Sequence, residues 1–162
     1  MAEDFTLDDT DHRILDRLQV DASLSNQALA AAVHTSPATC LRRVKRLVDA
    51  GVIERRVAIV SPQRMRAGLT AFAEVTLDRQ GAEHLEAFEA KAIAQPEVLQ
   101  CHRVSPGPDL MLVLHVWDMA AYHALVQRLF TQDANVRNVK TFFSVHRAKF
   151  ETRLPLPGLA RS

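Results

Sequence analysis

The sequence predicts an α+β protein of two small domains: a winged helix-turn-helix domain, then a ferredoxin-like domain with the element order β-α-β-β-α-β. Two patterns along the chain carry this prediction. Up to about residue 50, apolar residues recur every three or four positions, as on one face of a helix. From Leu69 they alternate with polar residues, as in a strand with two unlike faces. The length of 162 residues suits one domain or two small ones.

Three short helices are expected in the first domain. Asp8 or Asp9 can cap the first helix, which runs to about residue 20. Its inward positions share one face: Ile14, Leu15 and Leu18. Residues 25–33 form a second, shorter helix, so that only two residues remain for the turn before the third.

The third helix has clear start and end signals. The Ser36 hydroxyl can accept an N–H of the first turn, and Pro37 suits the first helical position because its missing N–H is not needed there. Gly51 follows the last turn, where a left-handed cap is favoured. The apolar residues between them are expected to face inward: Cys40, Leu41, Val44, Leu47 and Val48. Two helices joined by so short a turn, the second one cationic, are typical of a helix-turn-helix.

Charge is distributed unevenly along the chain. The formal net charge is only +1, but residues 1–33 carry −5 and residues 34–66 carry +6. The basic stretch covers the third helix and a two-stranded wing expected over residues 53–60, with Arg55 and Arg56 at its tip. A compact basic patch on a helix-turn-helix and its wing is the electrostatic footprint expected for duplex DNA. The alternative is a helical hairpin whose basic face is solvated.

The second half of the chain alternates between strand and helix patterns. Strands are expected over residues 69–77, 98–104, 110–117 and 136–146, and helices over residues 82–95 and 119–130. This order matches the ferredoxin-like split unit, whose helices cover one face of the sheet. The other face needs a cover, and four aromatic residues suggest that a second copy of the chain supplies it: Phe72, Trp117, Phe142 and Phe143.

These elements divide the chain into four parts. A helix-turn-helix domain spans residues 6–60, a linker residues 61–68, a ferredoxin-like domain residues 69–150, and a tail residues 151–162. The acidic N-terminus does not resemble a signal peptide. No run approaches the roughly 18 apolar residues that a membrane span requires. We therefore expect a cytoplasmic protein without a membrane partner.

Metal ions and cofactors are not expected. Cys40 and Cys101 lie far apart and lack the spacing of metal ligands. His102, His115 and His146 could join Cys101 around the predicted sheet, but adjacent strand residues point to opposite faces, so Cys101 and His102 cannot easily bind one ion.

Motifs along nearly the whole chain resemble those of one family. The N-terminal part carries Leu7-Asp8-x-x-Asp11, Ile14-Leu15, Leu24-Ser25 and Ser36-Pro37-x-x-Cys40-x-x-Arg43-Val44-x-x-Leu47-x-x-x-Gly51-x-Ile53. The C-terminal part carries Pro96-Glu97-Val98, Cys101, Val104, Asp109, Asp118-Met119 and Thr152-x-Leu154-Pro155. Together they resemble the leucine-responsive regulator/asparagine-responsive regulator (Lrp/AsnC) family. The resemblance implies a DNA-binding domain joined to a ferredoxin-like domain that senses amino acids and forms dimers, which often assemble into octamers.

Two positions depart from the family pattern. The sensor turn of the family usually reads Val-x-Gly-x-x-Asp-Tyr, whereas this chain has Val104-Ser105-Pro106-Gly107-Pro108-Asp109-Leu110. The glycine is shifted by one position and the tyrosine is absent. In addition, Val48 stands where the family usually has Glu, which alters local packing.

For DNA binding, the residue pattern and the resemblance agree. Residues at the start of the third helix are expected to reach base edges: Thr35, Ser36, Ala38, Thr39 and Arg42. Four arginines are expected to contact phosphates, which positions the protein without specifying sequence: Arg43, Arg46, Arg55 and Arg56. For Arg43, an ion pair with an acidic neighbour inside the domain is the alternative. A dimer would read an imperfect palindrome.

For an amino-acid effector, Asp109 is the natural partner of the ammonium group. Backbone N–H groups of the turn would bind the carboxylate, but Pro106 and Pro108 remove two donors and leave those of Ser105, Gly107 and Asp109. Position matching to the family adds Arg103, Met119, Phe142, Phe143 and Ser144. Arg103 stands where an apolar residue is common, which leaves an acidic or differently oriented ligand open. The alternative is a rigid corner whose ligand site is altered or lost.

The expected function is a sequence-specific transcription regulator and not an enzyme. Its expected partners are double-stranded DNA, an amino acid or related metabolite, and further copies of the chain. A nucleoid-type DNA-binding protein without an effector is the alternative. Siroheme decarboxylases resemble the same architecture, but they carry a Trp-Pro-Tyr-Asn segment where this chain has Pro108-Asp109-Leu110-Met111, which disfavours an enzyme.

Overall fold

The computed structural model describes residues 6–65 and 68–157 and divides into two compact units. The helical unit combines the described parts of Met1–Ile59 and Lys149–Ser162, and the sheet unit is Val60–Ala148. Two residues of the expected linker, Arg66 and Ala67, and the last five of the expected tail, residues 158–162, lie outside the described residues.

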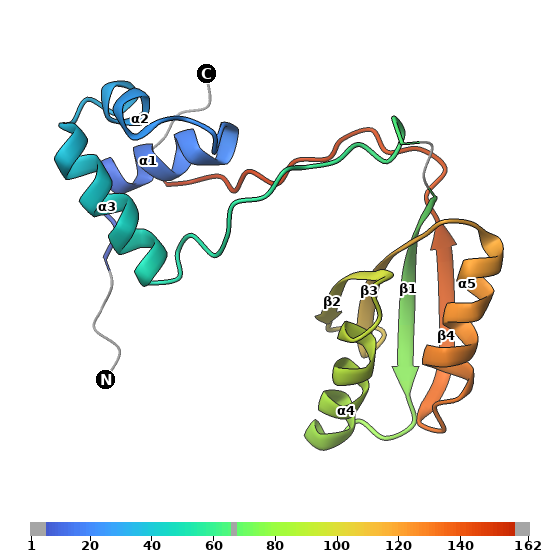
Figure 1. Ribbon diagram of the computed structural model, residues 1–162. Coiled ribbons are helices and arrows are strands. Elements are labelled where there is room, and N and C mark those ends of the chain that lie inside the picture. Colours follow the sequence, from blue (N-terminus) through green and yellow to red (C-terminus); the bar gives the residue numbers. More distant parts are fainter. Residues whose placement is uncertain (1–5, 66–67, 158–162) are drawn as a thin grey trace. The chain divides into compact units, whose positions relative to one another are not determined.

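Three helices form the helical unit: α1 (Asp9–Val20), α2 (Asn26–Ala32) and α3 (Pro37–Asp49) (Figure 1). Their N-termini are capped by side chains of Asp8, Ser25 and Ser36, each of which accepts a backbone N–H of the first turn. The core that they share consists of Ile14, Leu15, Leu29, Ala30, Val33, Cys40 and Leu47. The three predicted helices are therefore confirmed, with ends within about a residue of those expected.

Two sequence predictions for this unit are wrong. Residues 54–60 are irregular and exposed, and the expected wing hairpin is not formed. The stretch lacks the Gly or Asn residues that tight hairpin turns favour. Leu41 and Val48 are 60% and 46% exposed rather than inward. Each residue of a helix is rotated by about 100° from the one before, so burying Cys40 and Leu47 turns their successors out of the core.

The C-terminal segment packs on the helical unit. Gln19 of α1 exchanges two hydrogen bonds with the backbone of Leu154: Leu154 N donates to Gln19 Oε1 at 2.6 Å, and Gln19 Nε2 donates to Leu154 O at 3.3 Å. Arg153 forms an ion pair with Asp16, and Leu156 packs against the apolar core. Residues 153–156, expected to be a tail, are therefore part of the helical unit.

The sheet unit has the predicted order of strands and helices. Its elements are β1 (Leu69–Leu77), α4 (Ala82–Ile93), β2 (Val98–Arg103), β3 (Leu110–Val116), α5 (Met119–Val126), the π-helical turn η1 (Gln127–Thr131) and β4 (Val136–Phe143). The strands are antiparallel in the order β2-β3-β1-β4. This is the ferredoxin-like arrangement that the sequence predicts. The last strand ends at Phe143, earlier than the expected residue 146.

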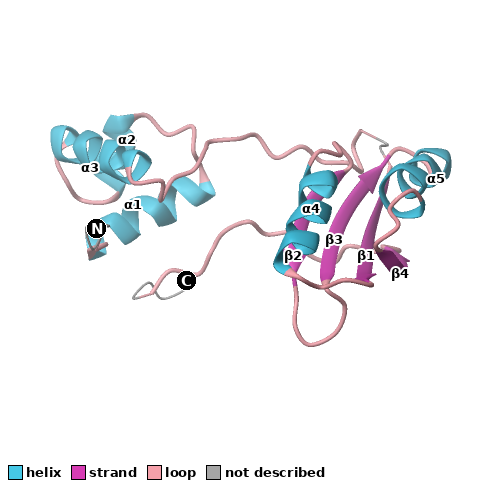
Figure 2. Ribbon diagram, turned by 90° about the horizontal axis from the view of Figure 1, so that it is seen from below, coloured by secondary structure: helices cyan, strands magenta, loops and turns pink. Residues whose placement is uncertain are grey.

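Helices α4 and α5 cover one face of the sheet (Figure 2). The buried residues of β1 and β3 alternate along each strand and meet Phe88, Leu125 and Leu129 of the helices. On the open face, Phe72 and Phe142 are register partners and are 41% and 54% exposed. Phe143 differs from the expectation, because it points to the helix side and its ring meets that of Tyr122 at 5.0 Å.

We expect truncation after Glu151 to destabilise the helical unit by about 2 kcal/mol, since it removes two hydrogen bonds and part of the apolar packing. Thermal unfolding followed by far-ultraviolet circular dichroism measures the change. Truncation after Pro157 keeps these contacts and serves as the control. Equal midpoints for the two truncated chains would contradict a structural role for the segment.

Candidate nucleic-acid interface and ligand-binding turn

The start of α3 is fixed against α2 by a short turn. Thr35 N donates to Ala30 O at 3.0 Å, and His34 between the helices adopts a left-handed φ of 57°. The side chain of Asn26 donates to Pro37 O at 2.8 Å. These bonds hold the N-terminus of α3 in one orientation, as a helix that enters a DNA groove requires.

The Ser36 hydroxyl is occupied by the helix cap. It accepts the Thr39 N–H at 3.2 Å and donates to Thr39 Oγ1 at 2.9 Å. Among the residues predicted to reach base edges, Ala38 and Arg42 are exposed, while Thr35 and Thr39 are half-buried. The exposed face of α3 therefore carries the small side chain of Ala38 and, one turn later, the cationic side chain of Arg42.

A buried carboxylate ties α3 to α1. Asp11 is fully buried, and it accepts hydrogen bonds from Arg43 Nη1 at 2.9 Å and from Arg46 Nη2. Arg43 Nη1 also donates to Asp8 Oδ2 at 2.7 Å. For Arg43, the structure therefore has the ion pair that the sequence left open as an alternative to a phosphate contact. No role beyond the family motif was predicted for Asp11, although its position three residues after Asp8 fits the capping box that the two form.

The ion pairs also set the charge states at this corner. The backbone N–H of Asp11 and the Arg43 guanidinium hold the pKa of the Asp8 carboxyl below its ordinary value. Hydrogen bonds to Asp8 and Asp11 raise the pKa of Arg43. Both groups therefore stay ionised at neutral pH.

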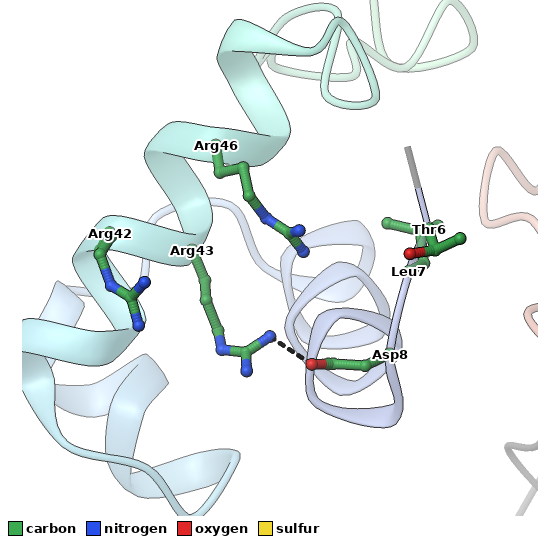
Figure 3. A pocket seen from close by; sticks show the side chains of 6 residues that line it. All are labelled: Thr6, Leu7, Asp8, Arg42, Arg43 and Arg46. Carbon is green, nitrogen blue, oxygen red and sulfur yellow. Dashed lines mark hydrogen bonds and ion pairs between the residues drawn. The ribbon is translucent and has the colours of Figure 1, made fainter. Parts of the chain in front are cut away.

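A hollow of about 250 Å³ lies beside these ion pairs (Figure 3). It is lined by Thr6, Leu7, Asp8, Arg42, Arg43 and Arg46. Arg42 and Arg43 are neighbours on one turn of α3 and Arg46 lies one turn later, and among the described residues of the lining Asp8 is the only acidic one. The hollow has the charge that an anionic group such as a phosphate prefers.

The remaining basic residues divide into two groups. Arg55 and Arg56 are exposed on the irregular segment after α3. Lys45, absent from the predicted contacts, lies on the exposed face of α3 and pairs with Asp49 one turn later at 2.7 Å. Lys45 follows Arg42 by three residues, and this spacing could have placed it on the same exposed face of the helix from the sequence alone.

The turn between β2 and β3 carries Asp109 at its end. Asp109 Oδ2 accepts the Leu77 N–H at 2.7 Å and Gln80 Nε2 at 3.3 Å. Its backbone N–H donates to Val75 O at 3.0 Å. The carboxylate predicted to bind an ammonium group is thus half-buried and holds the end of β1. Gly107 has a φ of +129° and nothing within 4 Å of its missing Cβ, so this part of the turn is open.

Arg103 pairs with α4. Its Nη2 donates to Glu89 Oε2 at 2.7 Å, and this interaction lowers the pKa of Glu89. The guanidinium therefore lies on the helix side of the sheet.

One chain does not bring all the predicted effector residues together. The turn with Arg103, Ser105, Gly107 and Asp109 lies where β3 begins, beside Val75 of β1. The other predicted residues lie where β3 and β4 end, beside Ala71 of β1: Met119, Phe142, Phe143 and Ser144. The two groups are thus at opposite ends of the sheet.

In the described ranges 6–65 and 68–157, no three His, Cys, Asp or Glu side chains gather as metal ligands. Burial raises the pKa of the Cys40 and Cys101 thiols, which keeps both protonated. Over those same residues, no helix is long and apolar enough to cross a membrane.

Comparison with known proteins finds two family models. The Lrp/AsnC ligand binding domain matches residues 70–154, and a winged helix-turn-helix DNA-binding model matches residues 7–54. An uncharacterized HTH-type transcriptional regulator of Haemophilus influenzae is 39% identical over 93% of this chain and 90% of its own length. The leucine-responsive regulatory protein of Salmonella typhimurium is 35% identical over 91% of this chain and 90% of its own. A transcriptional regulator of Neisseria meningitidis, solved as an L-Met complex, is 36% identical with a TM-score of 0.85, covering 94% of this chain and 98% of its own.

We expect Asp11→Ala to lower the free energy of unfolding by about 2 kcal/mol, because it removes a buried carboxylate that binds two guanidinium groups. Chemical denaturation monitored by circular dichroism measures the loss. Asp49→Ala removes an exposed pair with Lys45 and should cost at most about 0.5 kcal/mol. If both variants lost the same small amount, the buried carboxylate would not be the link between α1 and α3.

Proposed function

We propose that this chain, which belongs to the Lrp/AsnC family of DNA-binding transcriptional regulators, reads duplex DNA with the exposed face of α3. The observation that carries the proposal is a cationic helix whose N-terminus is capped and held in one orientation by its neighbours. Such a helix fits the major groove with its first turns toward the bases.

Within this surface, the arginines have different roles. Arg42 is exposed near the start of α3 and can reach a base edge, where a guanidinium pairs best with guanine. Arg43 and Arg46 are oriented by Asp8 and Asp11, and with Arg42 they line the hollow that would take a backbone phosphate. Arg55 and Arg56 would contact phosphates from the segment that follows.

A second copy of the chain covers the open face of the sheet in this proposal. Phe72 and Phe142 are adjacent on that face and exposed, the partly buried Val113 is the register partner of Phe72, and the partly buried Met111 lies two residues before Val113 on β3. Apolar area of this kind favours burial between two copies. A dimer would present two α3 helices to the two halves of a palindromic site.

The effector in this proposal is an amino acid bound at the turn that carries Asp109. The L-Met complex of the Neisseria relative supports this class of ligand. Because the two groups of predicted effector residues lie at opposite ends of one sheet, a site that uses both would combine residues of two copies. Ligand binding would then bias assembly and, through it, DNA affinity. Regulation by ligand and DNA, without catalysis, accounts for these features.

DNA reading is tested with duplexes selected from a random pool, compared with unselected duplexes in matched salt. We expect Arg42→Ala to weaken binding to selected duplexes by about 1–3 kcal/mol and to lose discrimination. Arg55→Ala should weaken both classes equally and reduce the salt dependence by about one counterion. Equal loss on both classes for Arg42→Ala would assign it to phosphates instead, and no discrimination by the unaltered protein would favour the nucleoid-type alternative.

The effector is tested by thermal unfolding with each of the twenty amino acids. A ligand that binds only the folded protein adds about 2.7 kcal/mol of stability at a hundredfold excess over its dissociation constant. We expect one chemical class to raise the midpoint and Asp109→Asn to abolish the rise, since Asn keeps an acceptor for Leu77 N–H but removes the charge. Glu86→Gln, an exposed change on α4, is the control. Absence of any shift would contradict an amino-acid effector and leave DNA binding untouched.

A further inference from the structure

Asn26 links the starts of the two helices that form the helix-turn-helix. It is the first residue of α2 and is half-buried, and its side-chain Nδ2 donates to the backbone oxygen of Pro37 at 2.8 Å. Pro37 is the first residue of α3. A helix carbonyl oxygen has two lone pairs and gives one of them to the N–H four residues later. The Asn26 amide can therefore bind Pro37 O without replacing a hydrogen bond of the helix.

This bond adds a second attachment between α2 and α3. The first is the turn, where Thr35 N donates to Ala30 O at 3.0 Å. His34 in this turn has a left-handed φ of 57°, a conformation that residues with a side chain seldom adopt and that persists only when surrounding contacts hold it. A helix attached at one point can pivot about it, whereas two attachments fix its tilt. The Asn26 amide therefore restrains the angle between the two helices.

The restraint acts on the end of α3 that faces DNA in the proposed function. Farther along the helix, Arg43 and Arg46 are already bound by acidic groups of α1. Arg42 lies five residues after Pro37, about 7.5 Å along the helix axis. A hydrogen bond to a base edge needs a donor–acceptor distance of about 3 Å and weakens steeply away from it. A small change in the tilt of α3 would therefore disturb base contacts of Arg42.

We propose that Asn26 is a positioning residue for sequence reading. Its hydrogen bond to Pro37 O sets the tilt of α3, and through that tilt it controls how well the protein discriminates between duplexes, without a base contact of its own. This inference rests on the proposed function, in which α3 reads DNA. It differs from a phosphate contact of Asn26, which would strengthen binding to all duplexes alike.

Affinities of the full-length protein for selected and unselected duplexes in matched salt test this role. Asn26→Ala removes the donor, and Asn26→Asp keeps the shape but leaves only acceptors. We expect each variant to lower the ratio of the two affinities by about five- to tenfold, the effect of one hydrogen bond. The added charge of Asp weakens both duplex classes alike, so it cancels in the ratio.

Two controls separate positioning from a loss of structure. Asp is favourable in the first turn of a helix, so Asn26→Asp preserves α2, and a lowered ratio that both variants share does not come from unfolding. Thermal midpoints check that each variant is folded at the temperature of the binding measurement. Gln27→Ala removes an exposed amide from the next position of α2 and should leave the ratio unchanged.

A double variant shows whether Asn26 acts through α3. In Asn26→Ala combined with Arg42→Ala, the loss of discrimination should be smaller than the product of the two single losses, because part of what Asn26 positions is already absent. The proposal is overturned if either Asn26 variant keeps the ratio, if Asn26→Ala weakens both duplex classes equally, or if the two losses multiply. Failure of the proposed function would also overturn it and would appear separately, as equal binding of both duplex classes by the unaltered protein.

Discussion

The buried carboxylate of Asp11 joins the two helices on which the DNA-binding unit depends. It accepts the Asp8 N–H at the start of α1 and the guanidinium groups of Arg43 and Arg46 from α3. A buried carboxylate without such partners would be strongly destabilising. The pairing therefore fixes α3 against α1 in one register, and with it the direction in which the exposed face of α3 points.

The same ion pairs change how the basic residues of the helical unit are interpreted. Eight basic side chains lie between residues 34 and 66, but Arg43 and Arg46 are bound to acidic groups of α1. Their charge is partly balanced inside the unit, so they act first as structural groups, and they also line the basic hollow beside α1. Arg42, one position before Arg43, lies on the exposed side, which is why the proposed reading of base edges uses it. Successive side chains of a helix point about 100° apart, so Arg42 and Arg43 face different surroundings although they are neighbours in the sequence.

The sheet unit follows from a different constraint. Its helices bury one face, which leaves Phe72 and Phe142 on the other. An antiparallel sheet also has two ends, and chemically different groups gather at each. Asp109 lies at one end, and His115, His146 and Arg147 lie at the other.

The sequence by itself determined the order and type of the elements, because capping residues and apolar periodicity are local. Ser36 with Pro37 located the start of α3 to the residue, and the alternation from Leu69 identified β1 and its two faces. Two predictions from local patterns were wrong. Leu41 and Val48 fit the apolar stripe of α3 but lie outside the core, and residues 54–60 do not form the expected hairpin. Only the tertiary structure decided which charges meet, as with Asp11 and Arg46, Arg103 and Glu89, or Asp16 and Arg153. The residues of these pairs are 14 to 137 positions apart in the sequence. Periodicity and composition describe only local stretches of sequence, so they cannot predict which of these distant residues meet.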